Sequence, residues 1–181
     1  MMPTHSRFIA VWLVVLAFPG CSRETADPNR FGSAVTRLTE LKTPLPDGAL
    51  RRRVYVPVYS SIYLGQDITY NMMDLTATVS VRNVSTQHPL VLLSARYYDS
   101  SGKQIREYVN TASELAALAT VEFVVARKDS TGGPGANFLV EWSGPSDIDE
   151  PIIEAVMIGR SGSAGYSFTS AGRPVKGAPP H

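Results

Sequence analysis

The segment 75–82 constrains the fold most strongly, because apolar and polar residues alternate along it without a break. The apolar set is Leu75, Ala77, Val79 and Val81, and the residues between them are Thr76, Thr78, Ser80 and Arg82. A period of two is typical of a β-strand that buries one face and leaves the other outside the core. We therefore expect a strand here.

Further segments of similar character follow at short intervals, separated by turn residues. The other expected strands are 54–59, 90–98, 104–109, 121–125, 138–142, 152–158 and 166–170. Pro57 cannot donate a ladder hydrogen bond, so 54–59 should be an edge strand or be interrupted there. Residues 112–120 fit either a helical turn or a loop. Seven or eight short strands without a convincing helix predict an all-β, immunoglobulin-like antiparallel β-sandwich.

The first twenty residues have the pattern of a secretory signal peptide. Arg7 precedes an unbroken apolar run of eleven residues, 8–18. At ~1.5 Å per residue this run spans roughly 16 Å, about half of the ~30 Å hydrocarbon core of a bilayer. Its length and flanks therefore favour an exported chain over one held by a transmembrane helix.

Cys21, the only cysteine, follows this run directly and resembles the lipid attachment site of bacterial lipoproteins. The resemblance implies that Cys21 is the mature N-terminus and carries the lipid, and Ser22 after it favours the outer membrane if the cell has one. Phe18 and Pro19 depart from the usual motif, in which Leu lies three residues before the cysteine. The alternatives are simple cleavage nearby or a free cysteine.

The rest of the chain divides into a flexible tether (21–50), the β-sandwich (51–173) and a short disordered tail (174–181). Residues 1–20 contain one basic and no acidic residue, so the mature part has 16 of each and no net charge. Such a balance disfavours nucleic acid as a partner. The run Arg51-Arg52-Arg53 is either a solvated junction or a contact with anionic lipid head groups beneath the anchor.

Several blocks within residues 53–173 resemble those of one bacterial family. They are 54–60, 75–78, 97–99 with Gly102-Lys103, 129–138, 150–159 and 167–173. The family is DUF3124, whose uncharacterised members are exported and often lipid-anchored. The resemblance implies export and anchoring, and it brings no activity with it.

Catalytic side chains are scarce in the mature part. His88 is the one histidine between the signal and the last residue, and no zinc-ligand spacing is present, so we expect no metal and no cofactor. The loop 131–135, Thr-Gly-Gly-Pro-Gly, leads into a strand without a following Gly-Lys-Ser/Thr, which disfavours a nucleotide. It is either a tight turn or a small anion-binding nest. The candidate binding residues of this loop are Asp129, Gly132, Gly133, Gly135 and Asn137.

Glu122, Glu141 and Glu154 each interrupt an apolar strand. If their neighbours face the core, the three carboxylates point outward and could share one sheet. They would then form ordinary pairs with arginines, bind a ligand or Ca²⁺, or act as a catalytic pair.

These observations favour a non-enzymatic, lipid-anchored binding module that engages another envelope protein or component. Its contact would be the strand edge at Pro57 or the loop 129–137. The second interpretation is a carboxylate-dependent hydrolase of envelope glycans, which requires Glu141 and Glu154 within ~10 Å of each other. The third is a carrier of a small ligand or Ca²⁺.

Overall fold

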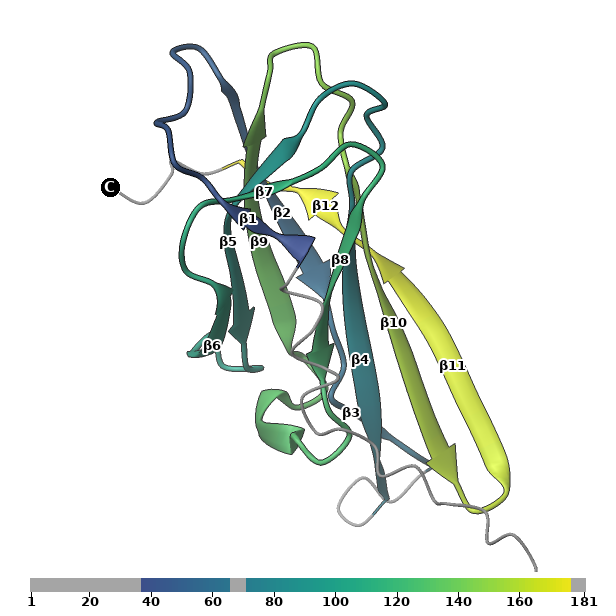
Figure 1. The fold of residues 1–181 in the computed structure, drawn as a ribbon. Helices are drawn as coiled ribbons and strands as arrows, with labels where there is room; N and C mark the ends of the chain where they lie inside the picture. Colours follow the sequence, from purple (N-terminus) through teal and green to yellow (C-terminus); the bar gives the residue numbers. More distant parts are fainter. Residues whose placement is uncertain (1–36, 66–70, 177–181) are drawn as a thin grey trace, which may run out of the picture.

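Strand β4 (Met72–Arg82) contains the alternating segment and lies inside a sheet, where it pairs with β10 (Ile152–Ser161) and with β8 (Thr120–Val125). The computed structural model describes residues 37–65 and 71–176. In this part of the chain two antiparallel sheets pack face to face, and there is no α-helix (Figure 1). The prediction of an all-β antiparallel sandwich is therefore confirmed.

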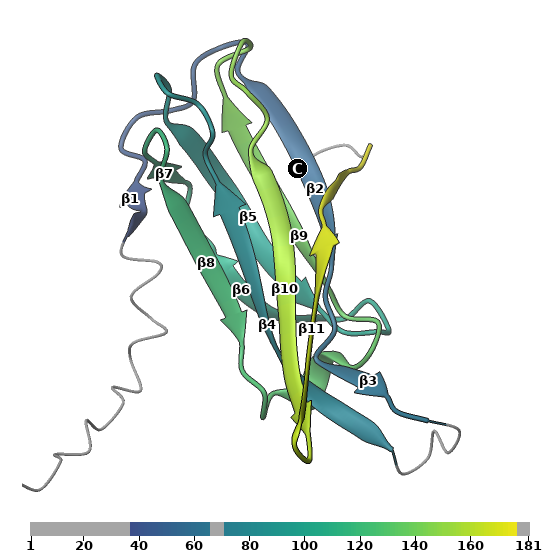
Figure 2. The ribbon, with the colours of Figure 1, turned by 90° about the vertical axis from the view of Figure 1, so that its right-hand side faces the viewer.

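The first sheet has seven strands in the described residues, in the order β1-β7-β5-β9-β2-β12, with β6 paired to β5. These strands are β1 (Thr39–Glu40), β2 (Leu50–Pro57), β5 (Leu90–Tyr98), β6 (Gln104–Val109), β7 (Ser113–Leu115), β9 (Asn137–Gly144) and β12 (Arg173–Pro174). The second sheet has five, in the order β11-β10-β4-β3 with β8 paired to β4, where β3 is Ser61–Tyr63 and β11 is Ala164–Ala171. Figure 2 shows β11 leading into β12, so the chain crosses from the second sheet to the first.

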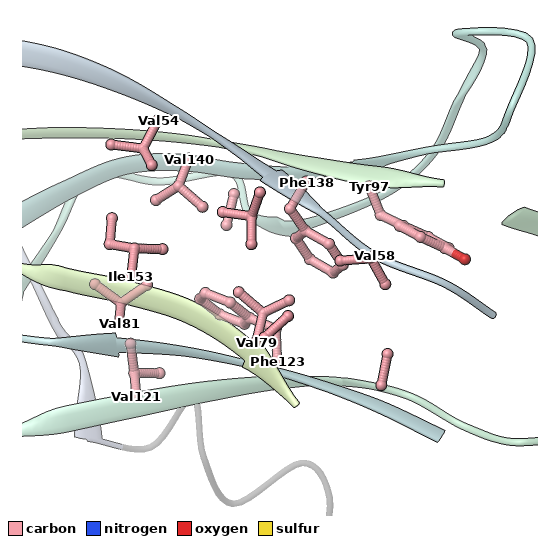
Figure 3. Packing of buried hydrophobic residues seen from close by; sticks show 14 of the residues in the cluster. Val54, Val58, Val79, Val81, Tyr97, Val121, Phe123, Phe138, Val140 and Ile153 are labelled. Carbon is pink, nitrogen blue, oxygen red and sulfur yellow. The ribbon is translucent and has the colours of Figure 1, made fainter. Parts of the chain in front are cut away.

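The core lies between the sheets and is built from the inward set of each alternating strand (Figure 3). Phe138 and Tyr97 of the first sheet are fully buried, with ring centroids 5.1 Å apart. Phe123 of the second sheet lies across the interface, 6.4 Å from Phe138. Burying a large apolar side chain contributes about 1.5–3 kcal/mol, so alternation fixes which face of each strand turns inward.

The structure has more strands than the seven or eight expected. The additional ones, β1, β3, β7 and β12, have only two or three residues each, too few to show a period in the sequence. Residues 113–115 form strand β7, and Leu118 adopts a positive φ of 58° in the turn after it, so this segment is not a helical turn. Strand β2 ends at Pro57, which confirms the predicted interruption.

The ends of the sandwich differ from the expected boundaries. Thr39 and Glu40 lie within the expected tether, yet they pair with β7. Pro174, expected in the disordered tail, pairs with Val54 of β2. Residues 1–36 and 177–181 lie outside the described residues, and with them lie the signal segment, Cys21 and most of the predicted tail. Within the described ranges, no helix is long and apolar enough to cross a membrane.

Candidate functional site

A cleft of about 430 Å³ opens on the first sheet, beside β2 and the C-terminal segment that follows β12. Its lining residues are Arg51, Arg52, Arg53, Leu93, Glu141, Pro174, Val175 and Lys176. Four of these side chains are cationic and one is a carboxylate. The remaining three are apolar.

Strand alternation aims two of the arginines outward. Val54 and Val56 of β2 belong to the core, so Arg51 and Arg53 lie on the opposite, outer face of the sheet. The register sets Arg53 opposite Glu141 of β9, and Ser94 of β5 is the next residue across the sheet. The arginine run is therefore part of a strand rather than a junction before it, and its side chains, of which Arg51 and Arg52 are exposed to solvent, form one wall of the cleft.

Glu141 lies between two arginines at the base of the cleft. Its Oε1 accepts a hydrogen bond of 2.9 Å from Arg53 Nε, and Arg53 Nη2 lies 2.8 Å away. Arg96 Nη1 reaches the same oxygen at 3.8 Å. The two positive charges compensate a carboxylate whose side chain is 11% exposed. Glu141 is thereby occupied in holding Arg53 against the sheet.

A bulge in β5 forms another wall of the cleft. Leu92 lies opposite Trp142 and Ser94 lies opposite Glu141, so Leu93 is an additional residue on the β5 side. A bulge of this kind redirects a side chain that would otherwise follow the alternation. Leu93 lines the cleft, while the neighbouring Ser94 stays 2% exposed on the strand.

The C-terminal segment closes the opposite side. Strand β12 pairs with β2, and the backbone N–H of Val175 donates to the carbonyl of Arg53 at 2.9 Å. These contacts hold Pro174, Val175 and Lys176 beside the arginines. The cleft is therefore assembled from segments more than 100 residues apart in the sequence.

Two of the four cations have no anionic partner within the described residues. Arg52 lies 3.9 Å from Glu150, and Arg53 pairs with Glu141. Arg51 and Lys176 make no ion pair with a carboxylate in this part of the chain. The cleft thus presents an excess of positive charge to whatever enters it.

The three glutamates predicted as a group do point outward, but they do not lie on one sheet. Glu122 and Glu154 flank Ser80 in a row across β8, β4 and β10 of the second sheet. Glu141 belongs to β9 of the first sheet, so its carboxylate lies on the opposite outer face of the sandwich. Glu141 and Glu154 therefore do not form the carboxylate pair that glycoside hydrolysis requires, and the three do not form one calcium site.

The two glutamates of the second sheet form ion pairs at its surface. Glu122 pairs with Arg37 at 2.9 Å, and Glu154 pairs with Arg82 at 3.3 Å. In residues 37–65 and 71–176, no three His, Cys, Asp or Glu side chains gather closely enough to hold a metal ion. On this face the two carboxylates therefore form ordinary ion pairs with arginines, which was one of the three interpretations.

The glycine-rich loop packs against the turn after β5. Ser100 Oγ donates to the Gly132 carbonyl and accepts from the Gly135 N–H, both at 2.9 Å. A Cβ on Gly132 would lie 1.9 Å from the Tyr97 hydroxyl, and Gly133 has a φ of 73°, so both positions require glycine. Because protein acceptors take the amides of Gly133 and Gly135, this loop is a structural turn rather than an anion nest.

The two ends of this loop are held by other contacts. Asn137 starts β9 and pairs with Pro57 and with Tyr98. Asp129 accepts from Thr131 and forms a 2.9 Å ion pair with Arg106. Burial acts to raise the pKa of Asp129, but the Thr131 hydrogen bonds and the Arg106 charge outweigh it and hold the pKa below its ordinary value. The Asp129 side chain therefore stabilises the loop, and Asn137 is held by the strand pairing of its backbone.

Sequence reasoning selected Glu141 and, separately, the run Arg51-Arg52-Arg53, but it did not bring the two together. The two-residue spacing of Arg51 and Arg53 indicates that the two share one strand face, and this signal was available. Nothing local in the sequence places Lys176 beside them, or marks Leu93 as the bulged residue.

Comparisons with known proteins give a family and a distant structural likeness. No curated protein matches the chain. A crystal structure described as Thermotoga maritima 1070 is similar over 71% of this chain and 96% of its own, with 8% identity and a TM-score of 0.38. Residues 51–175 match the family described as "Protein of unknown function (DUF3124)", and this range includes the cleft-forming strands. The chain belongs to the DUF3124 family.

Proposed function

We propose that the protein is an exported, lipid-anchored binding module that holds a ligand in the cleft between β2, the β5 bulge and the C-terminal segment. The observation that carries this proposal is the cleft, in which Arg51 and Lys176 lack a carboxylate partner among the described residues. Charge without a partner in a concave site contributes to binding of a complementary group.

Binding fits this site better than catalysis does. The carboxylate of the cleft, Glu141, lies within reach of both Arg53 and Arg96. A general acid or base must be free to reach the substrate, whereas Oε1 of Glu141 already accepts a hydrogen bond from Arg53. The second carboxylate of the hydrolase interpretation, Glu154, lies on the other outer face. Glu141 therefore acts by positioning Arg53.

The membrane anchor is tested by Cys21→Ser. Export with lipid attachment places the unchanged protein in the membrane fraction and the variant in the soluble fraction, because acyl chains bind bilayers at about 0.8 kcal/mol per buried methylene. Mass spectrometry of the mature N-terminus gives an independent readout. If both proteins fractionate alike and Cys21 carries no lipid, the anchored part of the proposal is wrong.

The binding surface is tested by site-specific photocrosslinking in intact cells. One crosslinking residue replaces Val175 in the cleft, and a matched control replaces Ile158, an exposed aliphatic residue on the outer face of the other sheet. We expect a discrete adduct at position 175 that is absent at position 158. The same adducts at both positions, or none at either, would contradict a ligand-binding cleft.

A further inference from the structure

We infer that the cleft recognises a phosphate ester that carries an apolar substituent. This inference rests on the proposed function, because it specifies the ligand of the same cleft. The shared chemistry covers two sources, the head group of an anionic phospholipid and a soluble phosphorylated metabolite.

Charge is the first argument. Glu141 is compensated by Arg53 and Arg96, and Arg52 lies 3.9 Å from Glu150. Arg51 and Lys176, which line the same cleft, have no such partner within residues 37–65 and 71–176. Two uncompensated cations around one concavity match a group that bears one or two negative charges.

The type of cation is the second argument. A guanidinium group presents a planar fork of donors that fits two phosphate oxygens, and an ammonium group adds a compact charge with freely oriented donors. Arg51 lies on a strand paired to β9, where it faces Ser143, so its backbone is fixed before a ligand arrives. Lys176 follows directly after Val175, whose N–H is bonded to Arg53. Both cations therefore start from ordered backbone, which lowers the entropic cost of binding.

The apolar lining is the third argument. Leu93, Pro174 and Val175 form part of the wall beside the cations, and Val175 is 39% exposed. Inorganic phosphate would leave this apolar surface uncovered, whereas an ester with a hydrocarbon portion covers it. A cleft of about 430 Å³ falls within the ~300–1,000 Å³ of sites for single small molecules, which favours one head group or metabolite over a polymer.

The test measures binding to the purified exported protein by NMR titration with three soluble probes. They are inorganic phosphate, glycerol phosphate and dihexanoyl phosphatidylglycerol below its micellar concentration. We expect phosphatidylglycerol to bind most tightly, with shifts centred on residues 51–53 and 174–176. Hexanoate, a carboxylate with a similar chain, should bind at least about tenfold more weakly, a difference equivalent to about 1.4 kcal/mol. Equal binding of hexanoate would overturn the phosphate assignment.

The matched variants are Arg51→Gln/Lys176→Gln in the cleft and Arg160→Gln/Lys103→Gln away from it. Each pair removes one arginine and one lysine charge, and Arg160 and Lys103 do not line the cleft. We expect the cleft variant to lose about tenfold or more in affinity while the control stays within about twofold. Leu93→Ser should weaken phosphatidylglycerol and leave glycerol phosphate unchanged. Equal losses in the cleft variant and the control would indicate non-specific attraction and overturn the inference.

Two further experiments distinguish a lipid head group from a soluble ester, and failure of the phosphate inference from failure of the proposed function. Cosedimentation with phosphatidylglycerol vesicles that Arg51→Gln/Lys176→Gln abolishes indicates a lipid head group, and binding of glycerol phosphate without cosedimentation indicates a soluble phosphate ester. If position 175 crosslinks in cells while no phosphate probe binds, the phosphate inference is wrong and the proposed function stands. If position 175 gives no adduct and no probe binds, both are wrong.

Discussion

The two outer faces of the sandwich follow the same rule of alternation and yet differ in what they can do. On the second sheet, Glu122 and Glu154 are paired with one arginine each, and their side chains are 30% and 35% exposed. On the first sheet, Glu141 is 11% exposed and lies near two arginines at the base of a cleft. A glutamate on a similar strand thus forms a surface ion pair on the second sheet, whereas on the first sheet it supports the proposed binding cleft.

The difference arises from two departures from regular pairing. The bulge at Leu93 raises a side chain beside the first sheet, and the segment after β12 adds Val175 and Lys176 along β2. The second sheet, at Glu122 and Glu154, keeps an unbroken register from β8 through β4 to β10. The cleft therefore arises from the bulge and from the segment after β12 rather than from regular strand pairing.

The largest expected effect in this comparison is on stability when the Glu141 charge is removed. Glu141→Gln takes the carboxylate away from Arg53 in a largely buried place, while Arg96 keeps its 2.9 Å ion pair with Glu107. We expect unfolding free energy to fall by about 2–3 kcal/mol, below the 3–5 kcal/mol of fully buried pairs because solvent still reaches this site. Urea unfolding of Glu141→Gln and the unchanged protein measures this. A loss under about 0.5 kcal/mol would show that burial does not distinguish the two faces.

A third carboxylate, at the loop between the sheets, lies between these extremes. Asp129 accepts hydrogen bonds from Thr131 and pairs with Arg106, whose guanidinium also lies 5.4 Å from the centre of the Tyr108 ring. Charged hydrogen bonds contribute about 1.5–3 kcal/mol when buried, and this one is partly exposed. We expect Asp129→Asn to cost about 1–2 kcal/mol in urea unfolding. Asp147→Asn, at an exposed aspartate without an ion pair within the described residues, is the control, and it should cost less.

The same loop should make stability depend on acid. Hydrogen bonds and Arg106 outweigh the opposing effect of burial and hold the pKa of Asp129 below its ordinary 3.8. A lowered pKa stabilises the folded protein fully above the ordinary value, and that contribution is lost as the pH falls through the lowered one. The stability difference between the unchanged protein and Asp129→Asn should therefore be constant near neutrality and shrink below about pH 4. A difference that does not change with pH would contradict this.

On the flat face, removing a charge should have little effect. The side chain of Arg37 is 54% exposed and that of Glu122 is 30% exposed, and exposed pairs contribute about 0.2–1 kcal/mol. We expect Glu122→Gln to cost about 0.5 kcal/mol or less, and this cost should disappear in 1 M NaCl. Urea unfolding at low and high salt measures it. A salt-independent cost near that of Glu141→Gln would remove the contrast between the faces.

Local pattern in the sequence predicts individual strands and their faces well. The alternation at 75–82 and the outward direction of Glu122, Glu141 and Glu154 are both present in the structure. The pattern does not say which strands share a sheet, because sheet order depends on contacts between distant segments. This is why the sequence left open whether Glu141 and Glu154 share one sheet.

Sequence patterns could not predict the cleft either, because the cleft also depends on contacts between distant segments. Its lining combines β2, the bulge of β5, β9 and the residues after β12, and a single bulged residue leaves no period in the sequence. The loop 129–137 shows the opposite case. Its glycines suggested a ligand site, but Gly135 donates its N–H to Ser100 and Gly132 packs against Tyr97. Composition alone cannot separate a turn that binds from a turn that packs.

The smallest expected effect concerns a buried hydroxyl next to Glu141. Ser143 lies two residues further along β9, opposite Arg51, and is 0% exposed with no hydrogen-bond partner for its Oγ within the described residues. A buried polar atom without a partner destabilises the fold, so its removal should cost nothing. We expect Ser143→Ala to change unfolding free energy by about zero or to raise it slightly. Ser80→Ala, at a buried serine in the row between Glu122 and Glu154, is the matched control on the flat face. A loss above about 1 kcal/mol at Ser143 alone would show that this hydroxyl bonds to the charge network around Glu141, and that the cleft is more extensively hydrogen-bonded than its ion pairs indicate.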